Sequence, residues 1–313
     1  MNEAQAMLWR DVREKGSLWG MLFTAKVYRL LGRWAAEPVL WGIVAYFFLK
    51  DGRMRQVSLQ YLKRITGTGL GAKRPGWTDV YRHYLSFART SLDRFDVWTD
   101  RLNDYRFHYH GEEHLIRLLD QGRGAVLLGA HLGNFDTLRV LGKRRGGKIH
   151  ILTDRRNSQK FSEILRRFCP HMDEGVVEYD SGSIDVIFGL KQVVERGEFV
   201  GLLGDRIAAI SARGSRRVSP AMFLGATALF PQAPFLFAAH LECPVFLLFG
   251  LRRSNRVYDL YVEPFAERIN LPEGPRDEAL ARYVAAFAAR LDYYCRRSPL
   301  QWFNFYDFWG KRS

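Results

Sequence analysis

The residues best suited to chemistry lie in the stretch Gly124–Asp136, where an apolar run of strand length ends at a histidine. His131 lies among small residues, and Asp136 follows it after a gap of four residues. A short turn lets the chain fold back, so we expect the Asp136 carboxylate to hydrogen-bond the imidazole. That pairing would fix the tautomer of the ring and make its other nitrogen a base near neutral pH. The sequence therefore predicts His131 and Asp136 as a catalytic pair.

A histidine and an aspartate this far apart also occur together in purely structural roles, and that alternative stays open. Two features favour chemistry. The small residues keep the turn open to a ligand, and His131 ends a buried strand, where a polar side chain needs a specific reason to be. In α/β sheets, ligands bind at the carboxyl ends of the strands. Asn134 comes next and offers an N-cap to the helix that follows.

Further polar side chains follow two of the later predicted strands. Arginine binds phosphate and carboxylate groups bidentately, so arginines gathered at one edge of the sheet are typical of a substrate site. Two alternatives stay open: the arginine-rich loop is a solvated basic face, or the acidic and basic neighbours form a structural ion pair. The predicted substrate-binding residues are Asn134 in the turn, Arg155 and Asn157 after strand 148–153, Asp205 and Arg206 after strand 198–204, and Arg216 in the long loop beyond.

The elements that must position these side chains alternate regularly from residue 124 onward. Strands that alternate with helices predict a mostly parallel central sheet flanked by helices on both faces, which is an α/β fold. A long loop is expected between strand 198–204 and helix 232–241. The predicted strands are 124–131, 148–153, 175–179, 198–204, 244–251 and 257–263, and the predicted helices are 134–143, 158–168, 183–196, 232–241 and about 275–297.

The N-terminal region is different in character. Residues 17–49 are its most apolar part, and Val39–Leu49 is an unbroken apolar run of eleven. A membrane span needs roughly twenty such residues, so an apolar helical hairpin lying on a membrane surface fits better than a spanning helix. A hairpin packed on the protein's own core is the alternative. We therefore expect a membrane-associating helical region at 1–105 and an α/β domain at 106–313.

Composition limits the partners. The formal net charge of +14 over 313 residues calls for an acidic partner such as nucleic acid, an anionic membrane surface or an acidic carrier protein. Nucleic acid is disfavoured because the chain carries no RNA-recognition signature, zinc-finger spacing or basic heptads. The three cysteines lie far apart and show no metal spacing, which favours buried thiols in a reducing compartment. We predict neither a metal nor a cofactor.

Three further segments are ambiguous. His108, His110 and His114 invite a metal site, but their spacing fits no common one and favours a solvated loop. His83, in a helical segment at 77–96, is expected on the surface or on a helix face. The aromatic C-terminal segment either packs back over the core, which we favour, or lies in a lipid interface.

Together these residues resemble the bacterial lipid A biosynthesis acyltransferases, within the wider lysophospholipid acyltransferase superfamily. His131-Leu132-Gly133-Asn134-Phe135-Asp136 is similar to the family's H-x-x-x-x-D/E motif. Other parts of the family pattern are matched by Arg155 and Asn157, by Asp205-Arg206, by Phe223-Leu224-Gly225, by Pro231-Gln232-Ala233-Pro234, and by Pro299 with Gln301-Trp302-Phe303. The resemblance covers most of the chain.

The resemblance implies a glycerolipid-acyltransferase-like fold and a definite chemistry. An acyl group would pass from a thioester, on acyl carrier protein or coenzyme A, to a hydroxyl or amine of a lipid acceptor at the cytoplasmic face of the inner membrane. Backbone N–H groups near Gly133, or an arginine, would stabilise the oxyanion. The sequence departs from the family at two places. Asp136 stands where glutamate is usual, and the tail has Asn304 and Tyr306-Asp307 where basic residues or histidine are common. These departures leave open an acceptor other than lipid A, such as an amino-acid lipid, a lysophospholipid or an aryl-polyene lipid, or a non-catalytic lipid-binding homologue.

Overall fold

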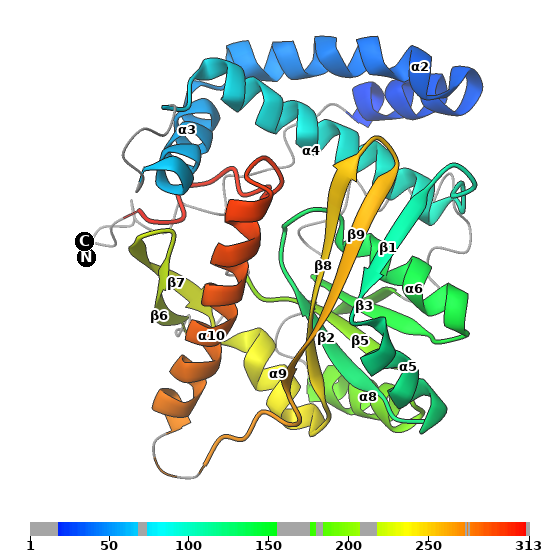
Figure 1. Cartoon of the computed structure of the whole chain (residues 1–313), viewed down its shortest axis with the longest axis vertical. Coiled ribbons are helices and arrows are strands. Elements are labelled where there is room, and N and C mark those ends of the chain that lie inside the picture. Colours follow the sequence, from blue (N-terminus) through cyan, green and yellow to red (C-terminus); the bar gives the residue numbers. More distant parts are fainter. Residues whose placement is uncertain are drawn as a thin grey trace.

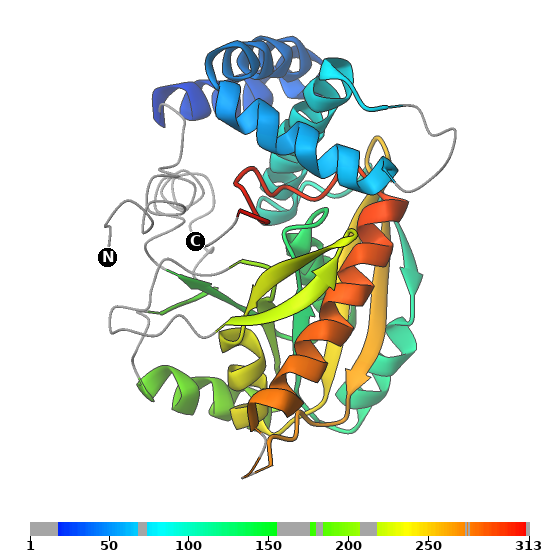
Figure 2. The ribbon, with the colours of Figure 1, turned by 90° about the vertical axis from the view of Figure 1, so that its left-hand side faces the viewer.

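A computed structural model describes residues 18–67, 74–154, 176–179, 184–206, 218–272, 274 and 276–310 of the chain. Within that part, a seven-stranded sheet forms the centre, helices lie on both of its faces, and three N-terminal helices lie across one end (Figures 1 and 2). The predicted α/β class with a mostly parallel central sheet is confirmed. The helix predicted at 158–168 lies outside the described residues.

The central sheet has the strand order β1-β9-β8-β2-β5-β3-β4. The five strands from β8 to β4 run parallel to one another, β9 is antiparallel to β8, and β1 is parallel to β9. All the strands predicted for this sheet after residue 124 are present. The strands are β1 (Arg106–His110), β2 (Ala125–Gly129), β3 (Ile149–Asp154), β4 (Val176–Tyr179), β5 (Phe199–Leu203), β8 (Val245–Ser254) and β9 (Val257–Ala266).

Strand β2 is apolar throughout because both faces of the sheet are covered. Val126 and Leu128 point into a large core shared with helices on one face, whereas Ala125 and Leu127 point into a second core on the other. This alternation follows from the two-residue period of a strand. The covering helices are α5 (Glu112–Asp120) and α6 (Leu138–Arg145) at the second core, and α8 (Ile184–Glu195), α9 (Ala233–Leu241) and α10 (Arg276–Arg297) at the first.

A two-stranded antiparallel ribbon, β6 (Val218–Phe223) and β7 (Ala226–Pro231), packs beside α10 in a region where the sequence predicted only a loop. Its two-residue turn consists of Leu224 and Gly225, both with positive φ (49° and 78°). Leucine is unusual in that conformation, because two-residue turns of this kind usually contain Asn-Gly or Asp-Gly. The Asp292 carboxylate accepts a 2.6 Å hydrogen bond from the Leu224 backbone N–H. A tertiary contact therefore stabilises a turn that the local sequence does not predict.

The N-terminal helices are α2 (Leu18–Lys50), α3 (Gly52–Thr66) and α4 (Trp77–Trp98). Gly32, with φ of 76°, interrupts α2, so that α2 consists of two helical segments. The first segment ends at this glycine. Among the described helices, none combines the length and the apolar character needed to cross a bilayer.

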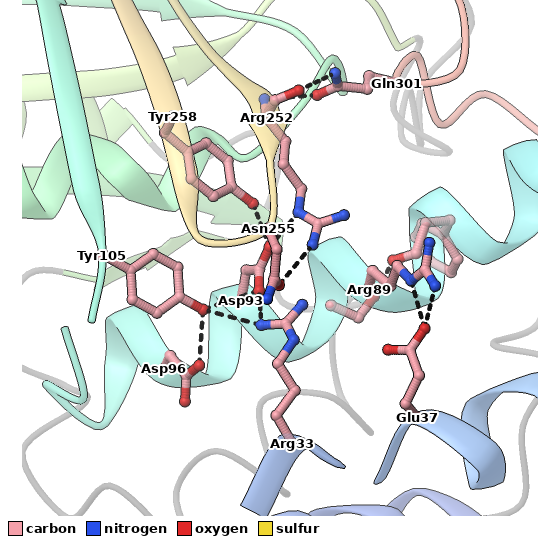
Figure 3. Close-up of polar contacts among 12 residues, drawn as sticks. Arg33, Glu37, Arg89, Asp93, Asp96, Tyr105, Arg252, Asn255, Tyr258 and Gln301 are labelled. Atoms are coloured by element: carbon pink, nitrogen blue, oxygen red, sulfur yellow. Dashed lines mark hydrogen bonds and ion pairs between the residues drawn. The ribbon is translucent and has the colours of Figure 1, made fainter. Parts of the chain in front are cut away.

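A buried ionic cluster joins these helices to the sheet (Figure 3). Asp93 on α4 is fully buried and accepts hydrogen bonds from Arg33 on α2, from the Tyr105 hydroxyl at 2.8 Å and from the Tyr258 hydroxyl of β9 at 2.6 Å. Arg252 of β8 forms an ion pair with the same carboxylate at 3.1 Å. These contacts hold α2 and α4 against β8 and β9. Removal of one member would leave a buried charge without compensation, which is strongly destabilising.

The aromatic C-terminal segment packs back onto the core, as the sequence predicted. Trp302 is fully buried, and its ring contacts Tyr61, Phe223 and Phe308 with centroid distances of 5.0 Å in each case. Trp309 stacks on Phe223. Within this segment, Trp302 and Phe303 lie beside the residues that follow β2 and β5.

Candidate active site

His131 and Asp205 are brought together by the order of the strands. In the central sheet β2 lies directly beside β5, and Gly129 at the end of β2 is in register with Leu203 at the end of β5. Each of the two functional residues follows its strand by the same two positions. Two parallel neighbouring strands therefore deliver an imidazole and a carboxylate to one point at the carboxyl edge of the sheet.

The contact between the two side chains is direct. His131 Nδ1 lies 2.8 Å from Asp205 Oδ1. Asp205 Oδ2 accepts two further hydrogen bonds, both of 3.0 Å, from the His131 backbone N–H and from Nε1 of Trp302. Because a carboxylate can only accept, Nδ1 carries the proton and the neutral ring has its lone pair on Nε2. The His131 side chain is 28% exposed, whereas that of Asp205 is not exposed at all.

The charges around the pair keep the imidazole neutral and the carboxylate ionised. Burial and the nearby Arg206 guanidinium lower the pKa of His131 below its ordinary value, and the opposing effect of Asp205 is smaller. Burial would raise the pKa of Asp205, but His131, Arg206 and the Trp302 indole outweigh burial and hold that pKa below its usual range. Near neutral pH the site therefore contains a neutral imidazole oriented by an anion.

Asp136 is not the residue that contacts Nδ1 of His131, in contrast to the sequence prediction. Its Oδ2 accepts a hydrogen bond from Nε of Arg94 on α4, and the two form an ion pair. The reason is the path of the turn. Gly133 adopts φ of 66° and lies so close to Gly250 that a Cβ at Gly133 would be 2.1 Å from its carbonyl oxygen. The chain then enters a 3₁₀ turn at Phe135–Thr137 (η2), which carries Asp136 toward α4.

Asn134 is buried and has a local structural contact. Its Oδ1 accepts a 3.1 Å hydrogen bond from the Asp136 backbone N–H and so caps the 3₁₀ turn, while its own N–H donates to the Gly250 carbonyl. The N-cap predicted from the sequence is confirmed. Substrate binding by Asn134 stays a prediction.

Arg206 also lies at the site. Its guanidinium donates a hydrogen bond to the backbone carbonyl of Phe303, and burial lowers its pKa from the ordinary value. Sequence reasoning placed Arg206 and Asp205 near His131 and considered them as an ion pair. It did not recognise Asp205 as the partner of the imidazole. Arg155, Asn157 and Arg216 lie outside the described residues.

The C-terminal segment completes the site, and sequence reasoning did not assign it that role. Leu132 and Trp302 form an antiparallel backbone bridge, and the Phe303 N–H donates to the His131 carbonyl at 2.8 Å. The Gln301 side chain both accepts from the backbone N–H of Arg252 and donates to its carbonyl, at 2.8 and 2.7 Å. The available signal was the similarity of Gln301-Trp302-Phe303 to a family signature, which carried no indication of what it contacts.

The arrangement as a whole is suited to proton abstraction. A neutral imidazole, one edge of which is partly exposed, is held by a buried carboxylate that can stabilise the imidazolium form. The positive charges of Arg206 and Arg94 both lower the pKa of His131 and so favour its neutral form.

The family described as bacterial lipid A biosynthesis acyltransferase matches residues 10–311, which is nearly the whole chain. A search of curated proteins gives no match.

Proposed function

The chain belongs to the bacterial lipid A biosynthesis acyltransferases, a family of enzymes that transfer acyl groups to lipid, and from this premise we propose the donor, the mechanism and the location. The donor is an acyl thioester on acyl carrier protein, with acyl-coenzyme A as the alternative. The acceptor is a hydroxyl or amine of a membrane lipid, either a lipid A precursor or another glycolipid or amino-acid lipid. The contact that carries the proposal is the 2.8 Å pair between His131 and Asp205 at the carboxyl edge of the sheet.

In the proposed mechanism, His131 is the general base. As the acceptor oxygen or nitrogen attacks the thioester carbon, Nε2 takes its proton and the ring becomes an imidazolium, which Asp205 stabilises. The tetrahedral intermediate then collapses, the carbon–sulfur bond breaks, and the imidazolium returns the proton to the departing thiolate. No covalent acyl-enzyme is required, because the thioester is already activated.

The oxyanion of the intermediate requires positive charge or hydrogen-bond donors nearby. The backbone N–H groups considered from the sequence are engaged: that of Gly133 donates to the Gln301 carbonyl at 2.8 Å and that of Asn134 to Gly250. We therefore assign the oxyanion to the arginines. Two contacts support this role. Arg206 donates to the carbonyl of Phe303, whose own N–H donates to the His131 carbonyl. Arg94 donates to Asp136 in the turn that follows His131.

The surface charge supports an acidic carrier protein as the donor. The chain has a net charge of +14, and the sequence of α3 contains basic residues and no acidic one. Complementary charge of this kind accelerates encounter with an acidic partner and makes the rate sensitive to salt.

Exposed apolar side chains on α2 support a location on the cytoplasmic face of the inner membrane. Around the break at Gly32, Trp34 is 89% exposed, Leu30 is 78% exposed and Leu31 is also largely exposed. Further along the helix Trp41, Tyr46 and Leu49 are exposed as well. Exposed tryptophan and leucine side chains of this kind, left uncovered by the described part of the chain, are typical of a surface that inserts shallowly into lipid.

The proposal is tested by acyl transfer from an acyl-carrier-protein thioester to lipid extracted from a deletion strain, with the product identified by mass spectrometry. We expect His131→Ala to abolish transfer while the circular dichroism spectrum is unchanged. His110→Ala is the matched control, because His110 also contacts a carboxylate, that of Asp259 at 3.3 Å, but belongs to β1 at the edge of the sheet.

Retained turnover in His131→Ala would refute the mechanism. Lipid or carrier binding without transfer by the unaltered protein, to any acceptor supplied, would identify a non-catalytic homologue. Comparison of lipids from the deletion strain and the parent identifies the acceptor as the lipid that lacks one acyl chain.

A further inference from the structure

The indole of Trp302 lies behind the candidate active site and is fully buried, so it cannot touch a substrate. Its one polar atom, Nε1, nevertheless donates a 3.0 Å hydrogen bond to Oδ2 of Asp205. We propose that Trp302 is a positioning residue: its N–H orients the Asp205 carboxylate and sets the basicity of His131. This inference rests on the function proposed above and assigns a role to the C-terminal Gln-Trp-Phe residues.

The three hydrogen bonds to Asp205 define the orientation of its carboxylate plane. Oδ1 accepts from the imidazole, while Oδ2 accepts from the backbone N–H of His131 and from Trp302. Two of these donors, the backbone N–H and the imidazole, belong to the same residue, His131. Trp302 supplies a donor to this carboxylate from a distant part of the chain, and it therefore limits rotation of the group about its Cβ–Cγ bond.

The indole is itself held firmly. Its ring lies among Tyr61, Phe223 and Phe308, and the Trp302 carbonyl is hydrogen-bonded to His83 Nε2 at 3.0 Å. The backbone bridge from Trp302 to Leu132 places the indole in a constant relation to the turn that carries His131. A donor fixed in this way can act on the carboxylate without movement of its own, which is what a preorganised site requires.

Gln301 anchors the same segment to a different strand. Its side-chain amide makes a pair of hydrogen bonds with the backbone of Arg252, near the end of β8, as a neighbouring strand would. The C-terminal segment therefore connects the turn after β2, the residue after β5 and the end of β8. This connection explains why the segment contains glutamine beside tryptophan rather than apolar residues alone.

The donor has a predictable electrostatic effect. A hydrogen bond to an ionised carboxylate stabilises the anion and reduces its attraction for the proton on the neighbouring imidazole. Loss of the indole N–H would concentrate more negative charge near Nδ1 and favour the imidazolium. We therefore expect the pKa of His131 to rise when the N–H is removed, on the order of one pH unit.

The test replaces Trp302 with 3-benzothienylalanine, which keeps the shape of the indole but has sulfur in place of the N–H. Trp302→Phe is the second variant. The matched control is the same replacement at Trp309, which lies in the same aromatic cluster. Its Nε1 donates a 3.3 Å hydrogen bond to the Phe223 carbonyl rather than to Asp205. The pKa of His131 is measured by NMR titration of histidine-labelled protein, with His131→Ala used to assign the signal.

We expect the benzothienyl protein to show a higher pKa for His131 and a kcat reduced about tenfold, since general-base catalysis depends on the orientation of the base. KM for donor and acceptor should not change, because Trp302 is sealed from both. The acid limb of the pH–kcat/KM profile should move upward by the same amount as the NMR titration. The Trp309 replacement should change neither value.

An unchanged His131 pKa in the folded benzothienyl protein would overturn the inference, as would a loss of folding in that protein when the Trp309 replacement folds. The NMR titration needs no substrate, so it separates the two proposals. A shifted pKa in a protein that transfers no acyl group would refute the proposed function and leave the positioning role, whereas active protein with an unshifted pKa would refute only the role of Trp302.

Discussion

His83 and His131 both meet the C-terminal segment, yet their surroundings differ. His83 on α4 is fully buried, with Nδ1 2.8 Å from the Ser58 hydroxyl and Nε2 3.0 Å from the Trp302 carbonyl. Both of its partners are neutral, and burial lowers its pKa to about 4. His131 has a buried carboxylate at Nδ1 and a partly exposed ring. A charged partner and a partly exposed ring therefore distinguish His131, which can act as a base, from His83, which is a structural imidazole.

The largest effect is expected when the charge of the partner is removed. Asp205→Asn gives His131 a neutral neighbour, like those of His83, and removes the anion that stabilises the imidazolium. We expect kcat to fall about 10³-fold, within the range of general-base contributions. Initial rates of acyl transfer measure the effect, and Asp259→Asn, which alters the pair with His110, serves as the control. A kcat within threefold of the unaltered protein would contradict the assignment of Asp205.

The second effect concerns stability in acid. His83 has a pKa of about 4 in the folded state and an ordinary value of about 6.5 when unfolded, so the unfolded chain binds more protons below pH 6.5. Stability is therefore fully present above pH 6.5 and is lost as the pH falls toward 4, by about 3 kcal/mol from this group.

Urea unfolding at pH 7 and pH 4 measures that loss. We expect His83→Gln to remove this part of the acid sensitivity, whereas the same change at the exposed His240 should leave it. Equal acid sensitivity in the unaltered protein and in His83→Gln would show that another group is responsible.

A third test separates the two aspartates near His131. In the structure Asp136 contacts Arg94, so Asp136→Asn and Arg94→Gln should each lower kcat about 100-fold by displacing charge at the site. If Asp136 acts through Arg94, the double variant should be no worse than either single one. Losses that multiply in the double variant would mean that Asp136 has a separate action on the ring.

The smallest effect is expected at Ser58, the hydroxyl partner of His83. Ser58→Ala leaves Nδ1 of a buried imidazole unsatisfied, at a cost of about 1–2 kcal/mol in the free energy of unfolding. Acyl transfer should not change, because Ser58 stabilises a structural histidine. Ser91→Ala, which removes a hydroxyl that bonds the Phe87 carbonyl within one exposed helix face, should cost less than Ser58→Ala. A decrease in kcat for Ser58→Ala with normal stability would contradict the purely structural role of His83.

The strands of the sheet could be predicted because they carry local signals. Apolar runs such as Ala125–Gly129 are long enough to identify a buried strand, and their alternation with helices predicts parallel pairing. The β6–β7 ribbon could not be predicted, because its Leu224–Gly225 turn depends on Asp292, distant in sequence. His83 was expected on a surface or helix face, but α4 is packed by α2 and α3 as well as by the C-terminal segment.

The site was predicted in part for the same reason. The position of His131 at a strand end follows from residues around it. The partner at Nδ1 depends on strand order, which places β5 next to β2 although Asp205 is 74 positions from His131 along the chain. Proximity in sequence favoured Asp136 instead. The contribution of Trp302 depends on a backbone bridge to Leu132 and likewise has no local signal.

The hydrogen bond from His83 to Trp302 spans 219 positions, and it has a consequence for synthesis on the ribosome. During translation the helices and every strand of the central sheet leave the exit tunnel before residues 301–303 do. His131 and Asp205 therefore emerge before Trp302, whose indole orients the Asp205 carboxylate. Acyl-transfer competence would therefore be gained only after β9, the last strand of the central sheet in chain order, has left the ribosome.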